Sequence, residues 1–247
     1  MQRVAIAEWL DSDSGTPEEI SVSLDDLWRI NRWFGGVGTT EGMLRGVAQK
    51  LGKSSLSLLE VASGSGYVPQ ICKERLEQDG VNIEFTLVDR ARSHLRNGSR
   101  AVAGDALALP FRDGSFDVVS CNLFAHHLGP ADLLRFVKEG LRVCRSAVLI
   151  NDLVRCWLHL ALVYAGMPLY RSRITRHDAP ASVRQAYTAG EMRALLGQIS
   201  AARVETHRRY LFRMAVIVWK PKCIGSAHDL AVLGGYERAQ KDIIVNV

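Results

Sequence analysis

The stretch that decides the fold reads Leu58-Leu59-Glu60-Val61-Ala62-Ser63-Gly64-Ser65-Gly66-Tyr67. An apolar run ends in a carboxylate, passes through a loop of small residues and enters a helical pattern. A second apolar run follows about one strand–helix–strand unit later and ends in Leu87-Val88-Asp89. In an open α/β sheet, small residues let the backbone approach a ligand, and an acid after the second strand accepts hydrogen bonds from ribose hydroxyls. Together the two stretches indicate a nucleoside pocket at the edge of a parallel sheet.

Loops such as Gly64-Ser65-Gly66 also occur as plain turns, so the identification depends on two further motifs. They are Gly104-Asp105-Ala106-Leu107-Ala108-Leu109-Pro110-Phe111 and Ser115-Phe116-Asp117-Val118-Val119-Ser120-Cys121-Asn122. In this order the four motifs resemble those of the class I S-adenosylmethionine (SAM)-dependent methyltransferases, over roughly residues 40–220. Within that family the chain is most similar to the small-molecule enzymes related to the ubiquinone and menaquinone biosynthesis methyltransferases.

The resemblance implies SAM as the cofactor and a set of residues that bind it. Asp89 would accept hydrogen bonds from the ribose hydroxyls, and Asp105 would accept one from the adenine amino group. Asn122 would line the space beside the sulfonium. The complete implied set is Glu60, Ala62, Ser63, Gly64, Gly66, Asp89, Arg90, Gly104, Asp105, Ala106, Asn122 and Leu123. Two alternatives stay open: Asp89 as a plain strand-end acid, and Asp105 as a turn former that bonds its own backbone.

One position departs from the family pattern. The family usually carries Glu-x-Gly-x-Gly-x-Gly, and Ala62 stands at the first glycine. Alanine is comfortable only at negative φ, so the sequence predicts weaker cofactor binding if this position needs the glycine conformation.

Composition limits the class of protein. The 247 residues are 47% hydrophobic and 23% charged, which is enough for one substantial core. The net charge is +5, with basic residues spread along the chain apart from Arg171–Arg176 and Arg208-Arg209, so no nucleic-acid partner is expected. The five cysteines are odd in number and lack C-x-x-C spacing, and no signal-peptide pattern opens the chain, so a reducing, cytoplasmic location is expected.

Alternating strand and helix patterns predict an α/β fold. The resemblance specifies a Rossmann-like, doubly wound, mostly parallel seven-stranded sheet with an antiparallel edge strand. Helices are expected from Thr16-Pro17 and from about Thr40 to Gly52. The expected strands are 56–61, 83–88, 100–103, 117–121, 146–151, 202–207 and 211–219. The expected domains are an N-terminal helical cap (1–50), a SAM-binding domain (51–220) containing a helical lid (153–185), and a C-terminal tail (221–247).

Residues 153–170 are nearly all apolar, but they are short for a membrane span and are interrupted by Arg155 and His159. The pattern predicts a helix inserted after the fifth strand. Three interpretations stay open: ordinary core, the wall of an acceptor pocket, and a surface for peripheral contact with a membrane. No transmembrane segment is predicted.

Three side chains are candidates for catalysis. His126 follows Asn122 by about one helical turn, Asp152 ends the fifth strand, and His177 lies beside Asp178. Each histidine has a structural role as its alternative. No metal site is predicted, because His126 and His127 are adjacent and would point about 100° apart on a helix.

The sequence thus predicts a SAM-dependent methyltransferase that acts on a small apolar acceptor. A phenol, a quinol or a polyketide-derived aromatic is expected, methylated at oxygen. The alternatives are carbon methylation of a quinone precursor, a nucleic-acid or protein methyltransferase, and a SAM-binding protein without catalysis. Asn122-Leu123-Phe124-Ala125 lacks the Asn-Pro-Pro-Tyr motif that the nucleic-acid alternative would favour.

Overall fold

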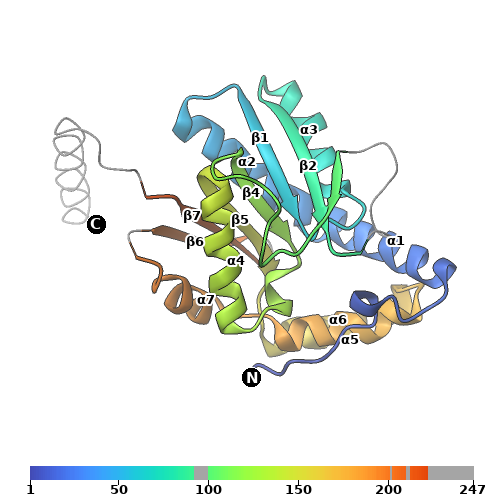
Figure 1. The fold of residues 1–247 in the computed structure, drawn as a ribbon. Coiled ribbons are helices and arrows are strands. Elements are labelled where there is room, and N and C mark those ends of the chain that lie inside the picture. The colour runs from blue at the N-terminus through green and yellow to red at the C-terminus, as the bar shows by residue number, and fades with distance from the viewer. Residues whose placement is uncertain (92–99, 201, 210–211, 222–247) are drawn as a thin grey trace, which may run out of the picture.

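The structure is a computed structural model that describes residues 1–91, 100–200, 202–209 and 212–221. The described residues end at Pro221, so the rest of the predicted C-terminal tail lies outside them. Figure 1 shows a central sheet with helices on both faces and a helical layer across one end.

The sheet has seven strands in the order β3-β2-β1-β4-β5-β7-β6, which confirms the predicted fold class. Strands β1 to β5 run parallel, and β7 pairs antiparallel with both β5 and β6. The reversal of strand order beside β1 creates the switch point where open α/β sheets bind ligands. The strands are β1 (Ser55–Val61), β2 (Asn82–Asp89), β3 (Ala101–Ala103), β4 (Phe116–Asn122), β5 (Cys144–Leu153), β6 (Arg203–Arg209) and β7 (Arg213–Trp219).

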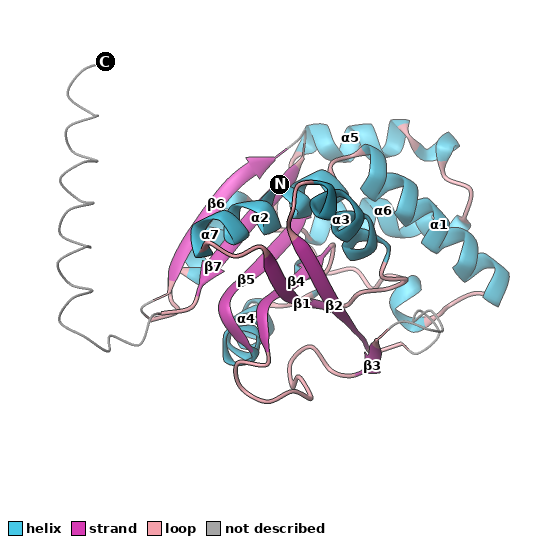
Figure 2. Cartoon of the chain, turned by 90° about the horizontal axis from the view of Figure 1, so that it is seen from above, coloured by secondary structure: helices cyan, strands magenta, loops and turns pink. Residues whose placement is uncertain are grey.

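Helices cover both faces of the sheet, and Figure 2 shows α3 and α4 on opposite sides. One core cluster lies under α2 and α3, and the other lies under α4 and α7. The described α-helices are α1 (Pro17–Trp33), α2 (Gly36–Leu51), α3 (Tyr67–Gln78), α4 (Pro130–Val143), α5 (Trp157–Ala165), α6 (Arg173–Gln185) and α7 (Ala189–Leu196). The described 3₁₀ turns are η1 (Leu10–Ser12), η3 (Ala125–His127) and η4 (Met167–Leu169).

Helix α1 begins where the sequence predicts, whereas α2 begins earlier than predicted. Thr16 and Glu19 form a capping box at the start of α1, as Thr16-Pro17 predicted. Gly35 adopts a left-handed conformation (φ 77°) between the two helices, so α2 starts at Gly36 rather than near Thr40. Leu44 and Val47 of α2 are fully buried against the sheet. Helix α2 therefore packs into the core beside the sheet.

The apolar segment 153–170 contains the predicted inserted helix, but the helix covers only part of the segment. Strand β5 continues to Leu153 because it pairs with Arg213 of β7, and α5 begins only at Trp157. Gly166 then ends α5 before the short turn η4. No described helix is long and apolar enough to cross a membrane.

Helices α1, α5 and α6 pack together across the end of the sheet, forming a cap (Figure 1). Asp26 of α1 is buried and accepts hydrogen bonds from the backbone N–H groups of Arg171 and Ser172, at 2.9 and 3.0 Å. It also pairs with Arg29. The residues before α1 run along α6, where Val4 N–H donates to Arg184 O and Trp9 N–H to Asp178 Oδ1. The cap is thus tied together by segments far apart in sequence.

Candidate functional site

The loop between β1 and α3 is built on left-handed backbone. Gly64 and Gly66 have φ values of 50° and 69°. A Cβ on Gly66 would lie 2.4 Å from Leu87 Cδ1, whereas a Cβ on Gly64 would meet nothing within 4 Å. Gly66 is therefore needed for packing, while the backbone at Gly64 faces open space that a ligand can approach. Ala62 also lies in the left-handed region, at φ 51°, so it takes the glycine conformation despite its Cβ.

Asp89 closes this loop from the end of β2. Its two carboxylate oxygens accept hydrogen bonds from Gly64 N–H at 2.8 Å and from Ala91 N–H at 3.0 Å. The side chain is buried but reaches the loop at the carboxyl edge of the sheet. A carboxylate at this place is the kind of acceptor that the resemblance implies for a ribose diol.

Glu60 lies beneath the loop, fully buried on β1. Ser120 Oγ donates to one of its oxygens, and Asn122 Nδ2 donates to the other at 2.8 Å. Burial raises the pKa of Glu60 to about 7, although these two hydrogen bonds lower it. Glu60 thus joins β1 to β4 and orients Asn122.

The other implied cofactor residues follow the strand ends. Leu123 is left-handed (φ 51°) directly after β4, and Arg90 is exposed after β2. Gly104 N–H donates to Asp89 O at 3.0 Å, which places the Asp105 loop beside β2. Asp105 accepts from Leu107 N–H at 2.9 Å, so the turn-forming alternative is present in the structure; Ala106 lies within that turn.

These residues fit a nucleoside cofactor. The open left-handed backbone at Gly64 and the Asp89 carboxylate face the same loop. Ser63 Oγ is buried there and has no hydrogen-bond partner among the described residues. A buried hydroxyl without a partner is unfavourable, so a ligand that bonds to it would stabilise the loop.

A cavity of about 180 Å³ lies between α1, α5 and the ends of β5 and β7. Most of its lining is apolar and comes from two segments that the sequence singled out: the aromatic end of α1 and the insert after β5. The lining residues are Asp26, Arg29, Ile30, Trp33, Phe34, Leu153, His159, Leu162, Val163, Gly166, Leu169, Tyr170, Phe212 and Arg213.

Arg213, which the sequence analysis missed, supplies a charge to this cavity. It is 2% exposed, and no carboxylate among the described residues lies within ion-pair distance. Its guanidinium donates to Phe34 O at 3.2 Å, to Asn31 Oδ1 at 3.0 Å and to Asn151 Oδ1 at 3.4 Å. Burial lowers the pKa of Arg213 to about 10, although the charge of Asp152 opposes this shift. The signal in the sequence was an arginine opening an otherwise apolar strand.

Buried hydrogen bonds join this cavity to the cofactor edge. Asn151, which accepts from Arg213, donates to Thr40 Oγ1 at 2.9 Å. Thr40 Oγ1 in turn donates to Asn122 Oδ1 at 2.8 Å, and Asn122 donates to Glu60. Every member donates in the same direction, from the cation at the cavity to the carboxylate under the loop.

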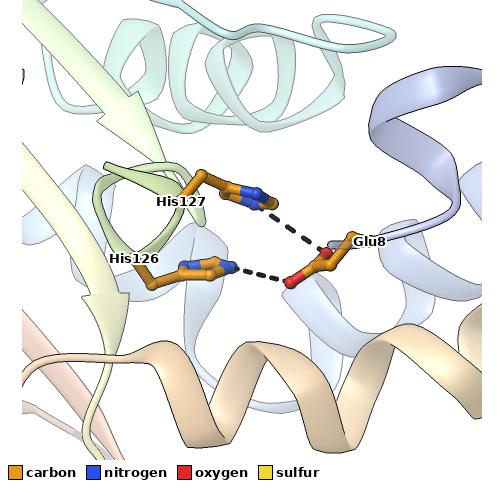
Figure 3. A group of neighbouring side chains, drawn as sticks. All are labelled: Glu8, His126 and His127. Atoms are coloured by element: carbon orange, nitrogen blue, oxygen red, sulfur yellow. Dashed lines mark ion pairs between the residues drawn. The ribbon is translucent and has the colours of Figure 1, made fainter. Parts of the chain in front are cut away.

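His126 is buried at the centre of a separate cluster (Figure 3). Asp152 accepts from His126 N–H at 2.8 Å and lies 2.6 Å from the ring Nδ1. Nε2 lies 3.5 Å from Glu8 Oε1. Burial lowers the pKa of His126, but Asp152 and Glu8 outweigh it and raise the pKa to about 10. The structure therefore brings His126 and Asp152 together, with both ring nitrogens directed at carboxylates.

The expectation that His126 and His127 diverge is wrong. They lie in a 3₁₀ turn, their ring centroids are 4.2 Å apart, and Figure 3 shows both rings directed at Glu8. His127 Nε2 lies 3.8 Å from Glu8 Oε2, and its Nδ1 lies 2.8 Å from Asp11 Oδ2. Diverging Cα–Cβ bonds do not keep the two rings apart, because the long side chains bend back toward the same carboxylate.

His177 and Asp178 do face each other, with Nδ1 2.7 Å from Oδ1. The His177 ring stacks on Trp9 at 4.0 Å, and Asp178 accepts from the N–H groups of Trp9 and Leu10. This pair therefore holds the N-terminal segment against α6. Among the residues that line the cavity, His177 does not appear.

Comparison with known families and sequences agrees with this geometry. Residues 59–150 match the model of a methyltransferase domain. The demethylmenaquinone methyltransferase of Beutenbergia cavernae is 30% identical over 138 residues, which cover 52% of this chain and 50% of that protein. The chain thus aligns with about half the length of this curated relative.

Solved structures share the fold. The plantazolicin methyltransferase BpumL, solved with a monoazolic desmethylPZN analog and SAH, superposes with a TM-score of 0.64 at 13% identity; the match covers 87% of this chain and 95% of BpumL. The PH0226 protein from Pyrococcus horikoshii OT3 gives a TM-score of 0.52 at 17% identity, covering 76% of this chain and 90% of that protein.

Proposed function

We propose that this chain, whose residues 59–150 match the model of a methyltransferase domain, is a SAM-dependent methyltransferase that acts on a small, largely apolar acceptor bearing an acidic oxygen. A phenol or a quinol fits this description. One observation carries the proposal: the apolar cavity between α1 and α5 contains the buried Arg213 guanidinium with no carboxylate within ion-pair distance among the described residues. An apolar lining selects an aromatic or aliphatic body, and a buried cation selects an anion.

The hydrogen bonds that run from Arg213 to Asn122 favour a position of the cavity next to the cofactor. Asn122 is the residue implied to line the sulfonium side, and it is separated from Arg213 only by Asn151 and Thr40. An acceptor in the cavity would therefore approach the carboxyl ends of β4 and β5, where open α/β sheets hold their ligands.

The chemistry needs alignment and a nucleophilic oxygen. SAM supplies a methyl group that its sulfonium already makes electrophilic. The protein must place the acceptor in line with it and exclude water, which the closed cap over the sheet favours. Arg213 would stabilise the phenolate form of the acceptor by its charge, so this proposal requires no histidine base. His126, Asp152 and His177 then have positioning roles that hold the cap and its N-terminal segment.

Carbon methylation of a quinone precursor is the second candidate. The relative that is 30% identical is named for demethylmenaquinone, which favours a quinone-type acceptor. The same apolar cavity would hold such a ring.

Exposed apolar side chains on α5 and η4 support an apolar source for the acceptor. Trp157, Leu158 and Leu169 are 69%, 62% and 72% exposed. Exposed apolar side chains of this size favour contact with a lipid surface or another apolar partner.

Mass spectrometry after incubation with methyl-labelled SAM tests the proposal. The panel should contain phenols and quinols, the corresponding O-methyl ethers, and aliphatic alcohols of similar size. We expect label in the phenols or quinols, with fragmentation placing it on oxygen. Label on a ring carbon would favour the second candidate, and transfer to alcohols and ethers as readily as to phenols would contradict the role of Arg213.

A further inference from the structure

We propose that Glu8, His126 and His127 form a zinc site that fastens the N-terminal segment to the end of β4. This site is independent of the proposed methyl transfer. The potential ligand atoms of the three side chains all lie within 4.8 Å of one another, and Figure 3 shows both rings directed at the Glu8 carboxylate.

The spacing matches zinc coordination. Zn²⁺ binds histidine nitrogen and carboxylate oxygen at about 2.0–2.2 Å in tetrahedral geometry, so neighbouring ligand atoms lie about 3.3–3.5 Å apart. His126 Nε2 lies 3.5 Å from Glu8 Oε1, and His127 Nε2 lies 3.8 Å from Glu8 Oε2. Both are too long for a good hydrogen bond and close to the separation of two ligands on one ion.

His126 Nε2 supplies an independent sign of a missing ligand. The side chain is 2% exposed, and among the described residues Nε2 has no hydrogen-bond partner, only the Glu8 carboxylate at 3.5 Å. Buried ring nitrogens are almost always bonded, and this one is aimed at the gap between the rings and Glu8.

The surroundings orient each histidine as a metal ligand. Metal-bound histidines usually direct the second ring nitrogen to a carboxylate or carbonyl. Here Asp152 lies 2.6 Å from Nδ1 of His126, and Asp11 lies 2.8 Å from Nδ1 of His127. Both Nε2 atoms are therefore left for a common ion.

The carboxylate ligand is held in the same way. Ser182 Oγ and Gln185 Nε2 each donate to Glu8 Oε1 at 2.6 Å, which fixes the carboxylate against α6. Arg3 donates to the backbone carbonyls of His126 and Leu128, which fixes the turn η3.

The charge also favours a divalent cation. Glu8, Asp11 and Asp152 bring three negative charges to this small region, and a bound cation would take the place of the imidazole proton that these carboxylates favour. A divalent ion would neutralise most of that charge. Nitrogen and carboxylate ligands suit Zn²⁺ rather than Mg²⁺ or Ca²⁺, which prefer oxygen ligands alone.

Titration of the full-length, tag-free, chelator-treated protein with Co²⁺ and Zn²⁺ tests the site. Tetrahedral Co²⁺ gives intense visible absorption, whereas adventitious six-coordinate Co²⁺ gives almost none. We expect one intense Co²⁺ site per chain that Zn²⁺ displaces, and a thermal midpoint that rises with added Zn²⁺.

Matched variants locate the site. His127→Ala and Glu8→Gln should abolish the intense absorption, and Asp11→Asn should weaken Zn²⁺ binding roughly 10- to 100-fold. The exposed His207 on β6 is the control, and His207→Ala should bind as the wild type does.

Two results would overturn the proposal. One is no tetrahedral Co²⁺ signal in the wild type, which would leave the cluster as a network of ion pairs. The other is a signal that persists in folded His127→Ala and Glu8→Gln protein, which would place the ion elsewhere. Circular dichroism confirms folding, and the wild-type spectrum decides the matter even if one variant fails to fold.

Discussion

Ala62 adopts a backbone conformation that is unfavourable for any residue with a Cβ. The left-handed region raises the energy of an L-residue by roughly 1–2 kcal/mol, and glycine avoids most of that strain. The family pattern flagged this position from sequence, but only the structure shows that alanine occupies the glycine conformation. The loop keeps its shape because Asp89 and the packing of Gly66 fix it from both sides.

Replacing Ala62 with glycine should therefore stabilise the protein. The strain relieved exceeds the roughly 0.5–1 kcal/mol by which glycine favours the unfolded chain, so Ala62→Gly should raise the free energy of unfolding by up to about 1 kcal/mol. SAM affinity should be retained or improved. Ala161→Gly, at an exposed position within α5, should instead lower stability by up to about 1 kcal/mol. Denaturant melts measure both, and two changes of the same sign would contradict the argument.

Glu60 should make stability fall as pH rises. Its pKa is about 7 in the folded protein against 4.5 in the unfolded chain, so the folded state binds the extra proton between these values. The free energy of unfolding should decrease by about 3 kcal/mol across this window, at about 1.4 kcal/mol per pKa unit. Glu60→Gln should remove this part of the slope and be the more stable protein at pH 7.5. Exposed Glu74→Gln should keep the wild-type slope; an unchanged slope in folded Glu60→Gln would refute the assignment.

At the scale of elements, apolar runs predicted every strand within a few residues. Where the apolar pattern did not show where a strand ends, pairing with the neighbouring strand fixed the end. Nothing local marks the end of β5 at Leu153, because its last residues are held by Arg213 of β7. Helix α5 is short because Gly166 and Pro168 follow it, a signal that the sequence did contain.

Some residues of α5 pack in the protein interior, and others line the cavity. Leu160 is 5% exposed and does not line the cavity, whereas Val163 does. Val163→Asp should raise KM for apolar acceptors at least about 10-fold, because it introduces a charge into an apolar pocket. Affinity for SAM should change little. Ala161→Asp places the same charge on the exposed face of the same helix and should leave KM unchanged. Steady-state kinetics with long and short acceptors measures this, and equal effects of both variants would exclude the cavity as the acceptor site.

At the scale of the whole molecule, the cap was the least predictable part. Sequence patterns placed α1 before the sheet and a helical insert after β5, but not the contacts between them. Glu8 meets His126, and Asp26 meets Ser172, across more than 100 residues of chain. Such contacts depend on tertiary packing, which hydrophobic periodicity does not encode. Arg213 was missed for the same reason, since only the folded chain shows its cavity.

Asp26 connects α1 to the segment before α6 by hydrogen bonds, so its loss should destabilise the cap. Asp26→Ala leaves two backbone N–H groups and Arg29 without their carboxylate, and should lower the free energy of unfolding by about 2–4 kcal/mol. Its neighbour Asp25 is exposed, and Asp25→Ala should change stability by less than about 0.5 kcal/mol. Thermal and denaturant melts give both values, and similar losses would show that Asp26 does not join the two elements.

The proposed SAM site lies at the carboxyl ends of β1 and β2, where Asp89 would bind the ribose. Calorimetric titration with SAM tests it directly. Asp89→Asn keeps an acceptor oxygen for Gly64 N–H but removes the charge, and Asp89→Ala removes both. We predict one SAM per wild-type chain and a loss of about 2–3 kcal/mol in Asp89→Ala, or roughly 30- to 150-fold in Kd, with a smaller loss in Asp89→Asn. The exposed Asp113→Asn variant should bind as the wild type does. Unchanged SAM affinity in folded Asp89→Ala protein would contradict the account.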